Sequence, residues 1–193
     1  MDGEKVLSTL LNGNRRFVEG AVEAPRRDRS RRVETAGGQS PVAIVLCCSD
    51  SRVVPELIFD QGIGDLFVVR VAGNVVDDVV LGSIEYAAAH LSTPLLLVMG
   101  HTGCGAVNAT VAGGEAEGHT GSFIEEIRPS MEGCGSCEPD DVARESVRAT
   151  VRRLSVSEPV LGPIAARGGL VVRGAFYDTG SGEVTLLDTP VSV

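Results

Sequence analysis

The sequence contains no apolar run long enough to cross a membrane. A transmembrane helix needs about 20 consecutive apolar residues, and the longest apolar stretches of this 193-residue chain, such as residues 42–47 and 95–99, are far shorter. The first 17 residues also lack the charged-then-apolar pattern of a secretory signal. We therefore expect a folded protein of the cytoplasm.

Cysteine is scarce and odd in number, which argues against a disulfide framework. In a cytosolic chain, cysteines are more often metal ligands or free thiols. The pair Cys134 and Cys137 forms a Cys-x-x-Cys motif without the strand–helix context of a redox motif, so we favour a loop that contains two thiols over a reversible redox pair. The five cysteines are Cys47, Cys48, Cys104, Cys134 and Cys137.

Basic side chains are in the minority, and they are concentrated near the N-terminus. The net charge is −9, yet residues 1–32 carry eight basic and five acidic side chains. The arginine cluster at 26–32 permits either contact with nucleic acid or an arm that wraps the body or a neighbouring subunit. Because the rest of the chain is acidic, we favour the arm and expect no nucleic-acid partner.

Apolar strand-like segments alternate with amphipathic helical segments along most of the chain. This alternation predicts an α/β fold with a mostly parallel central β-sheet flanked by helices and closed by a C-terminal antiparallel edge strand. We expect a single domain over residues 1–193, with an N-terminal helix and basic arm over 1–38 and the least ordered stretch at 113–141. Strands are expected at 42–47, 66–71, 95–99, 170–175 and 183–187, and helices at 4–18, 54–59, 77–91, 103–111, 138–154 and 158–166.

Two short motifs follow two of the expected strands, where ligands of such sheets bind. They are Cys48-Ser49-Asp50-Ser51-Arg52 and His101-Thr102-Gly103-Cys104. Two thiols and one imidazole supply three ligands for a tetrahedral zinc and leave a fourth position for water, as catalytic zinc requires. The alternative is a closed structural site whose fourth ligand is Asp50 or another cysteine.

The spacing of Asp50 and Arg52 after Cys48 suggests two different roles beside the metal. Asp50, two residues after a ligand, can accept a hydrogen bond from a metal-bound water. Arg52, two residues further, can clamp that carboxylate, keep it ionised and fix its direction. Asp50 also has the reach to be a fourth ligand itself, which would close the site.

Together these residues resemble the β-class carbonic anhydrases, and the resemblance extends beyond the ligands. It is strong over 39–112, moderate over 4–18 and 142–188, and faint between 113 and 141. The segments that carry it are residues 11–17 (LNGNRRF), 48–70 (CSDSRVVPELIFDQGIGDLFVVR), 83–88 (SIEYAA), 98–107 (VMGHTGCGAV) and 174–178 (GAFYD).

The resemblance implies a set of site residues. Zinc would be held by Cys48, His101 and Cys104, and Asp50 with Arg52 would form the catalytic dyad. The residues implied in substrate binding are Gln39 and Gly105 as hydrogen-bonding groups and Phe67, Ala72 and Tyr86 in an apolar CO2 pocket built partly from a second subunit. A homodimer or a dimer of dimers is the implied assembly.

The implied function is zinc-dependent, reversible hydration of carbon dioxide to bicarbonate and a proton by zinc-bound hydroxide. Two alternatives remain: hydrolysis of carbonyl sulfide or carbon disulfide on the same scaffold, and a non-catalytic zinc-stabilised binding or redox-sensing protein. The second is disfavoured because nothing in a purely structural site calls for all three of Asp50, Arg52 and Gln39. The chain has no tryptophan, so we do not expect the bicarbonate regulation through a tryptophan-containing site that some members show.

Overall fold

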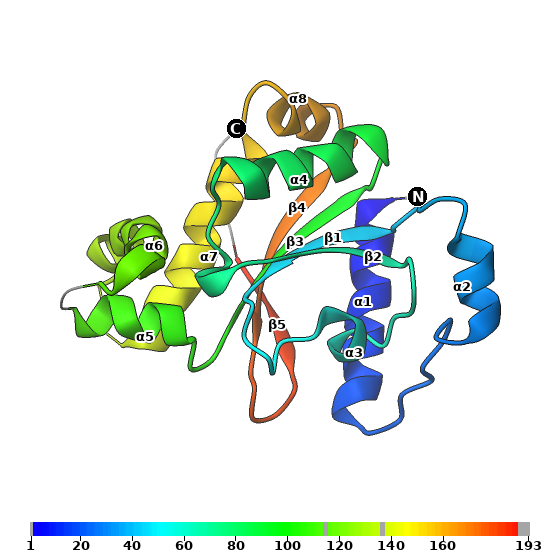
Figure 1. Cartoon of the computed structure of the whole chain (residues 1–193), viewed down its shortest axis with the longest axis horizontal. Helices are drawn as coiled ribbons and strands as arrows, with labels where there is room; N and C mark the ends of the chain where they lie inside the picture. Colours follow the sequence, from blue (N-terminus) through cyan, green and yellow to red (C-terminus); the bar gives the residue numbers. More distant parts are fainter. Residues whose placement is uncertain (1, 114–115, 136–137, 189–193) are drawn as a thin grey trace.

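A five-stranded sheet forms the centre of the molecule (Figure 1). The computed structural model describes residues 2–113, 116–135 and 138–188. The strand order is β2-β1-β3-β4-β5; β1 pairs with β2 and β3, and β3 with β4, in parallel, whereas β4 and β5 are antiparallel. The predicted fold class is therefore confirmed. The strands are β1 (Ala43–Cys47), β2 (Leu66–Arg70), β3 (Leu95–His101), β4 (Val171–Tyr177) and β5 (Val184–Leu187).

Helices cover both faces of the sheet (Figure 1). The larger core lies between one face and α4 to α8, and the smaller core lies between the other face and α1 and α3. No helix in the described part of the chain is long and apolar enough to span a bilayer. The helices are α1 (Gly3–Val18), α2 (Arg29–Thr35), α3 (Pro55–Ile58), α4 (Asp78–His90), α5 (Gly105–Ala112), α6 (Gly121–Gly133), α7 (Pro139–Ser155) and α8 (Leu161–Ala166), with the 3-10 turns η1 (Ala72–Asn74) and η2 (Gly118–Thr120).

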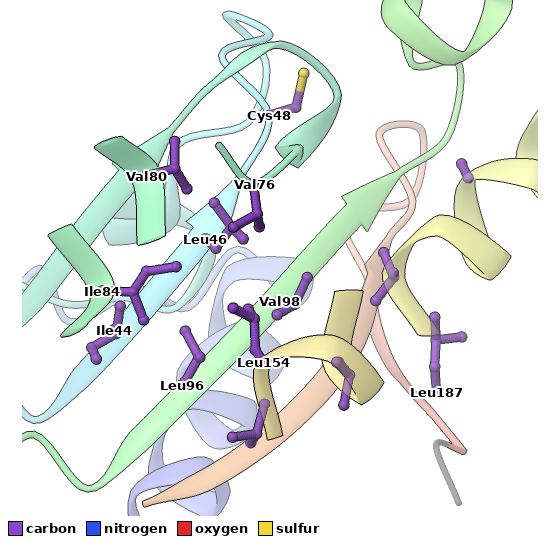
Figure 2. Packing of buried hydrophobic residues seen from close by; sticks show 14 of the residues in the cluster. Ile44, Leu46, Cys48, Val76, Val80, Ile84, Leu96, Val98, Leu154 and Leu187 are labelled. Carbon is purple, nitrogen blue, oxygen red and sulfur yellow. The ribbon is translucent and has the colours of Figure 1, made fainter. Parts of the chain in front are cut away.

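The central strands are continuous apolar runs because both of their faces are buried. Successive side chains of a strand point to opposite faces. Ile44 and Leu46 accordingly belong to the larger core, whereas Val45 and Cys47 belong to the smaller one. Figure 2 shows Ile44 and Leu46 along β1, with Cys48 beyond the end of that strand.

Helix ends follow the local sequence. The carboxylate of Asp2 accepts the Glu4 N–H at the start of α1, and the carboxylate of Asp77 accepts the Val80 N–H at the start of α4. These acidic caps satisfy backbone donors that have no partner within the helix. The start of α7 instead has proline at its first position, which suits the helical φ angle.

Asn14 fixes α1 to two distant parts of the chain. Its buried amide nitrogen donates to the carbonyls of Ile58 (3.2 Å) and Gly182 (2.8 Å), and its amide oxygen accepts the Val184 N–H (2.9 Å). The preceding residue, Gly13, has no room for a side chain, since a Cβ there would lie 1.9 Å from the Phe59 carbonyl oxygen. At Gly13, the backbone of α1 therefore lies directly against the backbone at the end of α3.

The basic arm lies against the body of its own chain. The Arg16 guanidinium is 2.8 Å from the buried Asp60 carboxylate, and Arg26 and Arg31 both bind the Asp65 carboxylate. The arm also contains α2, which we did not expect; the side chain of Asp28 caps it by accepting the Arg31 N–H.

The stretch at 113–141 differs from the prediction because it contains α6. Phe123, Ile127 and Met131 recur every four residues and place one apolar stripe against the larger core, where Ile127 is fully buried. Glycines and acidic residues around this stripe obscured it in the sequence. Cys134 follows α6 as a free, partly exposed thiol, whereas Cys137 lies outside the described residues.

Candidate metal centre

The three candidate ligands lie at one edge of the sheet. Cys48 directly follows β1, His101 ends β3, and Cys104 precedes the first residue of α5. Since β1 and β3 are neighbours and parallel, their carboxyl ends meet at this edge. The candidate ligand atoms all lie within 4.8 Å of one another, and the two sulfurs are 4.0 Å apart. Two sulfurs bound tetrahedrally to zinc at about 2.3 Å would be about 3.8 Å apart, so the spacing fits that ion.

His101 presents one ring nitrogen without a partner. Its Nδ1 lies 3.0 Å from the Thr102 carbonyl oxygen, and because a carbonyl only accepts, Nδ1 must donate there. Its Nε2 is buried and has no hydrogen-bond partner among the described residues. An unpaired buried nitrogen costs free energy, whereas an imidazole held through Nδ1 in this way is typical of a metal ligand that binds through Nε2. This atom supports the fit between the cluster and a cation.

The two thiols lie within hydrogen-bond distance of each other, so the pKa of each depends on the protonation of the other. The Cys48 sulfur accepts N–H groups from Asp50 and Gly73, each at 3.4 Å. A hydrogen bond from the Cys104 thiol, opposed by burial and aided by His101, holds the pKa of Cys48 well below the usual thiol range, while the hydrogen bond to Cys48 and burial raise the pKa of Cys104. A pair so coupled loses its second proton with difficulty unless a cation takes its place. A divalent ion would stabilise both thiolates.

The Asp50 carboxylate is bound by Arg52 and does not belong to the group of candidate metal ligands. The Arg52 guanidinium contacts both carboxylate oxygens, at 2.7 and 3.0 Å, and its backbone N–H also donates to Asp50. These hydrogen bonds, those of the side chain first, hold the pKa of Asp50 well below the ordinary aspartate range. Among the described residues the candidate metal group contains the two cysteines and the histidine, and Asp50 is outside it. The arrangement is the one expected of an ionised acceptor with a fixed direction.

Several side chains that support these loops escaped the sequence analysis. Arg70, at the end of β2, donates to the carbonyl oxygens of Cys48 (3.3 Å) and Asp50 (2.7 Å). Asp140, at the start of α7, accepts the Gly103 N–H at 2.9 Å. These three contacts join residues far apart in the chain, so no local spacing in the sequence indicates them.

The hydroxyl of Thr102 ties the second loop to the hairpin between β4 and β5. It lies 2.9 Å from the Thr179 hydroxyl and accepts the Thr179 N–H, while the Thr102 N–H donates to the Tyr177 carbonyl. Because the Thr102 carbonyl in turn orients His101, the hairpin fixes the direction of that ring.

Two of the residues implied in substrate binding lie beside the cluster. Gly105 is the first residue of α5, directly after Cys104. Ala72 begins η1, and the next residue, Gly73, donates its N–H to the Cys48 sulfur.

The other three lie elsewhere in the chain. Phe67 pairs with Ile44 near the start of β2, its ring is 6.4 Å from that of Tyr86, and Gln39 precedes β1. A strand rises about 3.3 Å per residue, and Cys48 follows the opposite end of β1. One copy of the chain therefore does not bring Gln39, Phe67 and Tyr86 to the cluster.

Comparison with known proteins gives a consistent result across sequence and structure. The family described as carbonic anhydrase matches residues 43–184. Carbonic anhydrase 2 of Mycobacterium tuberculosis is 40% identical over 186 residues, which cover 93% of this chain and 90% of that protein. The carbonic anhydrase of Pseudomonas aeruginosa is 32% identical over 198 residues, which cover 93% and 86%.

Solved structures show the same likeness in three dimensions. A Coccomyxa β-carbonic anhydrase in complex with acetazolamide superposes with a TM-score of 0.77 at 31% identity, over 94% of this chain and 86% of that one. One of two tetrameric β-carbonic anhydrases from Sordaria macrospora gives a TM-score of 0.73 at 28% identity, over 80% and 84%. With its fold, its Cys–His–Cys cluster and these relatives in agreement, the chain belongs to the β-class of the carbonic anhydrase family of enzymes.

Proposed function

We propose that this enzyme catalyses the zinc-dependent, reversible hydration of carbon dioxide to bicarbonate and a proton. The observation that carries the proposal is the cluster of Cys48, His101 and Cys104 beside an Asp50 carboxylate already paired with Arg52. The 40% identity to a mycobacterial carbonic anhydrase over most of the chain supports the same reaction.

Cys48, His101 and Cys104 would hold the zinc. Two thiolates and a neutral imidazole balance the charge of a divalent ion and leave one position open. A zinc ion held by these residues would lower the pKa of a water molecule and so supply the nucleophile. The three side chains are buried, and the hydrogen bond from His101 Nδ1 to the Thr102 carbonyl fixes the ring.

Asp50 would orient the nucleophile. An ionised carboxylate only accepts hydrogen bonds, so Asp50 holds an O–H group of the attacking molecule and fixes where its lone pair points. Arg52 keeps the carboxylate ionised and occupies both of its oxygens. Gly105 and Ala72 would line the substrate site next to the cluster.

A second copy of the chain would complete the apolar substrate pocket. Gln39, Phe67 and Tyr86 lie away from the cluster of their own chain, so their contribution requires a homodimer or a dimer of dimers. On α4, Val79 is 78% exposed and Tyr86 is 47% exposed, as expected of side chains that a partner covers. In sedimentation velocity we expect at least a dimer, and Val79→Lys should shift the protein toward monomer and lower its activity in parallel. A fully active monomer would contradict this assembly.

The reaction is tested by stopped-flow hydration of carbon dioxide with metal analysis of the same sample. Cys48→Ala and His101→Ala should lose zinc and activity together, whereas Cys134→Ser, outside the cluster, should keep both. Full activity in either of the first two variants would overturn the proposal. Carbonyl sulfide and carbon disulfide, offered in the same assay, should release negligible sulfide.

We also propose that the protein works in the cytoplasm. Cys47, Cys48 and Cys104 are free thiols, and a reducing compartment keeps such thiols available for metal. Fractionation of cells that express the full chain should place it with cytoplasmic markers.

A further inference from the structure

Asp140 connects the first turn of α7 to the loop that carries two of the candidate ligands. Its carboxylate accepts the backbone N–H of Gly103 at 2.9 Å. Gly103 lies between His101 and Cys104 and has a φ of 64°, a conformation that glycine adopts readily. The loop therefore has a flexible residue at its centre, and Asp140 is the side chain that holds its N–H.

The carbonyl oxygen of the same glycine accepts a hydrogen bond from Arg52, which forms the proposed catalytic dyad with Asp50. Arg52 Nη2 donates to the Gly103 carbonyl at 3.3 Å and to the Asp50 carboxylate at 2.7 Å. A continuous series of hydrogen bonds thus runs from Asp140 through Gly103 and Arg52 to Asp50. A rotation of the Gly103 backbone would take away one of the two acceptors that fix the Arg52 guanidinium.

The helix that bears Asp140 is firmly packed. Its side chains Val142, Val147, Val151 and Leu154 are buried in the larger core. At Gly100, next to the ligand His101, a Cβ would lie only 2.8 Å from Val147, so α7 closely approaches the end of β3. Asp140 is therefore a fixed point against which the loop can be held.

Asp140 differs from its neighbour in the same helical turn. Asp141 carries the same charge near the same helix N-terminus, where both complement the helix dipole. Asp141 is exposed, while Asp140 is half-buried and bonded to Gly103. The dipole alone thus does not account for the contact with the loop.

We propose that Asp140 is a positioning residue that sets the direction of the Asp50 carboxylate through Gly103 and Arg52. This inference rests on the proposed hydration reaction, in which Asp50 orients the nucleophile. Asp140 itself contacts neither metal ligand side chains nor the dyad; it acts only by holding the loop between the two.

The kinetic test compares Asp140→Ala and Asp140→Asn with Asp141→Ala, all in the full-length, zinc-loaded protein. Asp140→Ala should lower kcat/KM about tenfold with zinc content unchanged, because a lost hydrogen bond to a charged group has an effect of this order. Asp140→Asn should recover most of the activity, since its amide oxygen still accepts the Gly103 N–H. Asp141→Ala should match the wild type. An Asp140→Ala enzyme as active as the Asp141→Ala enzyme overturns the inference.

Coupling to Arg52 separates positioning from general damage. In an Arg52→Ala background, Asp140→Ala should reduce the remaining activity less than twofold, because the residue through which it acts is already gone. A full tenfold loss in that background would show that Asp140 acts by another route and would overturn the inference.

Amide hydrogen exchange at Gly103, measured by NMR, provides a readout that does not depend on activity. Exchange should be at least tenfold faster in Asp140→Ala than in Asp141→Ala and near the wild-type rate in Asp140→Asn. If the variants show this pattern of exchange rates but the wild-type enzyme hydrates no carbon dioxide, the proposed function is wrong and the contact between Asp140 and Gly103 is still supported. Unchanged exchange in Asp140→Ala overturns the inference itself. Should Asp140→Ala not fold, Asp140→Glu, which keeps the charge and displaces the acceptor, is judged by the same exchange and kinetic criteria.

Discussion

Cys47 and Cys48 are neighbours in the chain with opposite chemistry. Cys47 faces the smaller core, where burial raises the pKa of its thiol to about 12. Cys48 faces the larger core, where a hydrogen bond from the Cys104 thiol lowers the pKa of its thiol against the opposing effect of burial. The alternation of a β-strand therefore separates an inert thiol from a candidate metal ligand.

This difference predicts an order of alkylation. In metal-free protein at pH 7.5, iodoacetamide should modify Cys48 before Cys47, because the thiolate is the reactive form. Added zinc should protect Cys48 and leave the reaction of Cys134, which is partly exposed, unchanged. Peptide mass spectrometry after timed labelling measures this order, and modification of Cys47 ahead of Cys48 would contradict it.

The pair of Asp50 and Arg52 predicts a titration. Arg52 lowers the pKa of Asp50, so Arg52→Ala should raise it toward the ordinary value of about 3.9. Carbon-13 NMR of the Asp50 carboxyl group should show an ionised group down to about pH 3 in the wild type and protonation at higher pH in the variant.

The same shift has a consequence for stability. Because the folded-state pKa lies below the unfolded value of about 3.9, the pair stabilises the fold above about pH 4, and this contribution is lost as the pH falls through the lowered folded pKa. The stability difference between wild type and Arg52→Ala should therefore be constant from pH 5 to 7. A difference that grows on acidification would contradict the assignment.

At the scale of elements, α1 depends on the buried amide of Asn14. Asn14→Ala would leave the Ile58 and Gly182 carbonyls and the Val184 N–H without their partner. An unsatisfied buried polar group costs about 1–3 kcal/mol, and with partial access of water we expect a total loss of about 3 kcal/mol. The free energy of unfolding in urea measures it. Asn12→Ala, exposed on the same helix, should change stability by less than about 0.5 kcal/mol.

The elements that sequence predicts well are those with a strong local pattern. The apolar runs of β1 and β3 and the amphipathic patterns of α1 and α4 gave elements within a few residues of those observed. The two ligand motifs were visible for the same reason, since each is a short run directly after a buried strand. α6 was not predicted because its apolar stripe consists of only three residues, spaced four apart, among glycine and acidic residues.

What the sequence could not provide is contact between distant segments. Arg70 reaches the Cys48 loop because β2 pairs with β1, and Asp140 reaches Gly103 because α7 packs on β3. Neither pairing follows from residue spacing. The separation of Gln39 and Phe67 from the cluster also depends on strand direction, which only the assembled sheet defines.

At the scale of the whole molecule, we expect a bound metal ion to stabilise the folded state. A ligand at 1,000 times its Kd stabilises the native state by about 4 kcal/mol, which for a domain of this size corresponds to about 8–16 °C in Tm. Removal of zinc with a chelator should therefore lower the Tm by that amount, as scanning calorimetry measures. In His101→Ala, which lacks one ligand, the chelator should have no effect, and an equal drop there would contradict a site at this cluster.

The pairing of β1 with β3 also decides when the site can exist. Cys48 and His101 are 53 residues apart in the chain, and a ribosome adds about 5–20 residues per second, so roughly 3 to 10 seconds separate their synthesis. During that interval the nascent polypeptide has Cys48 but neither of the other two candidate ligands, His101 and Cys104. A metal ion that needs all three side chains could therefore bind only after Cys104 has been made.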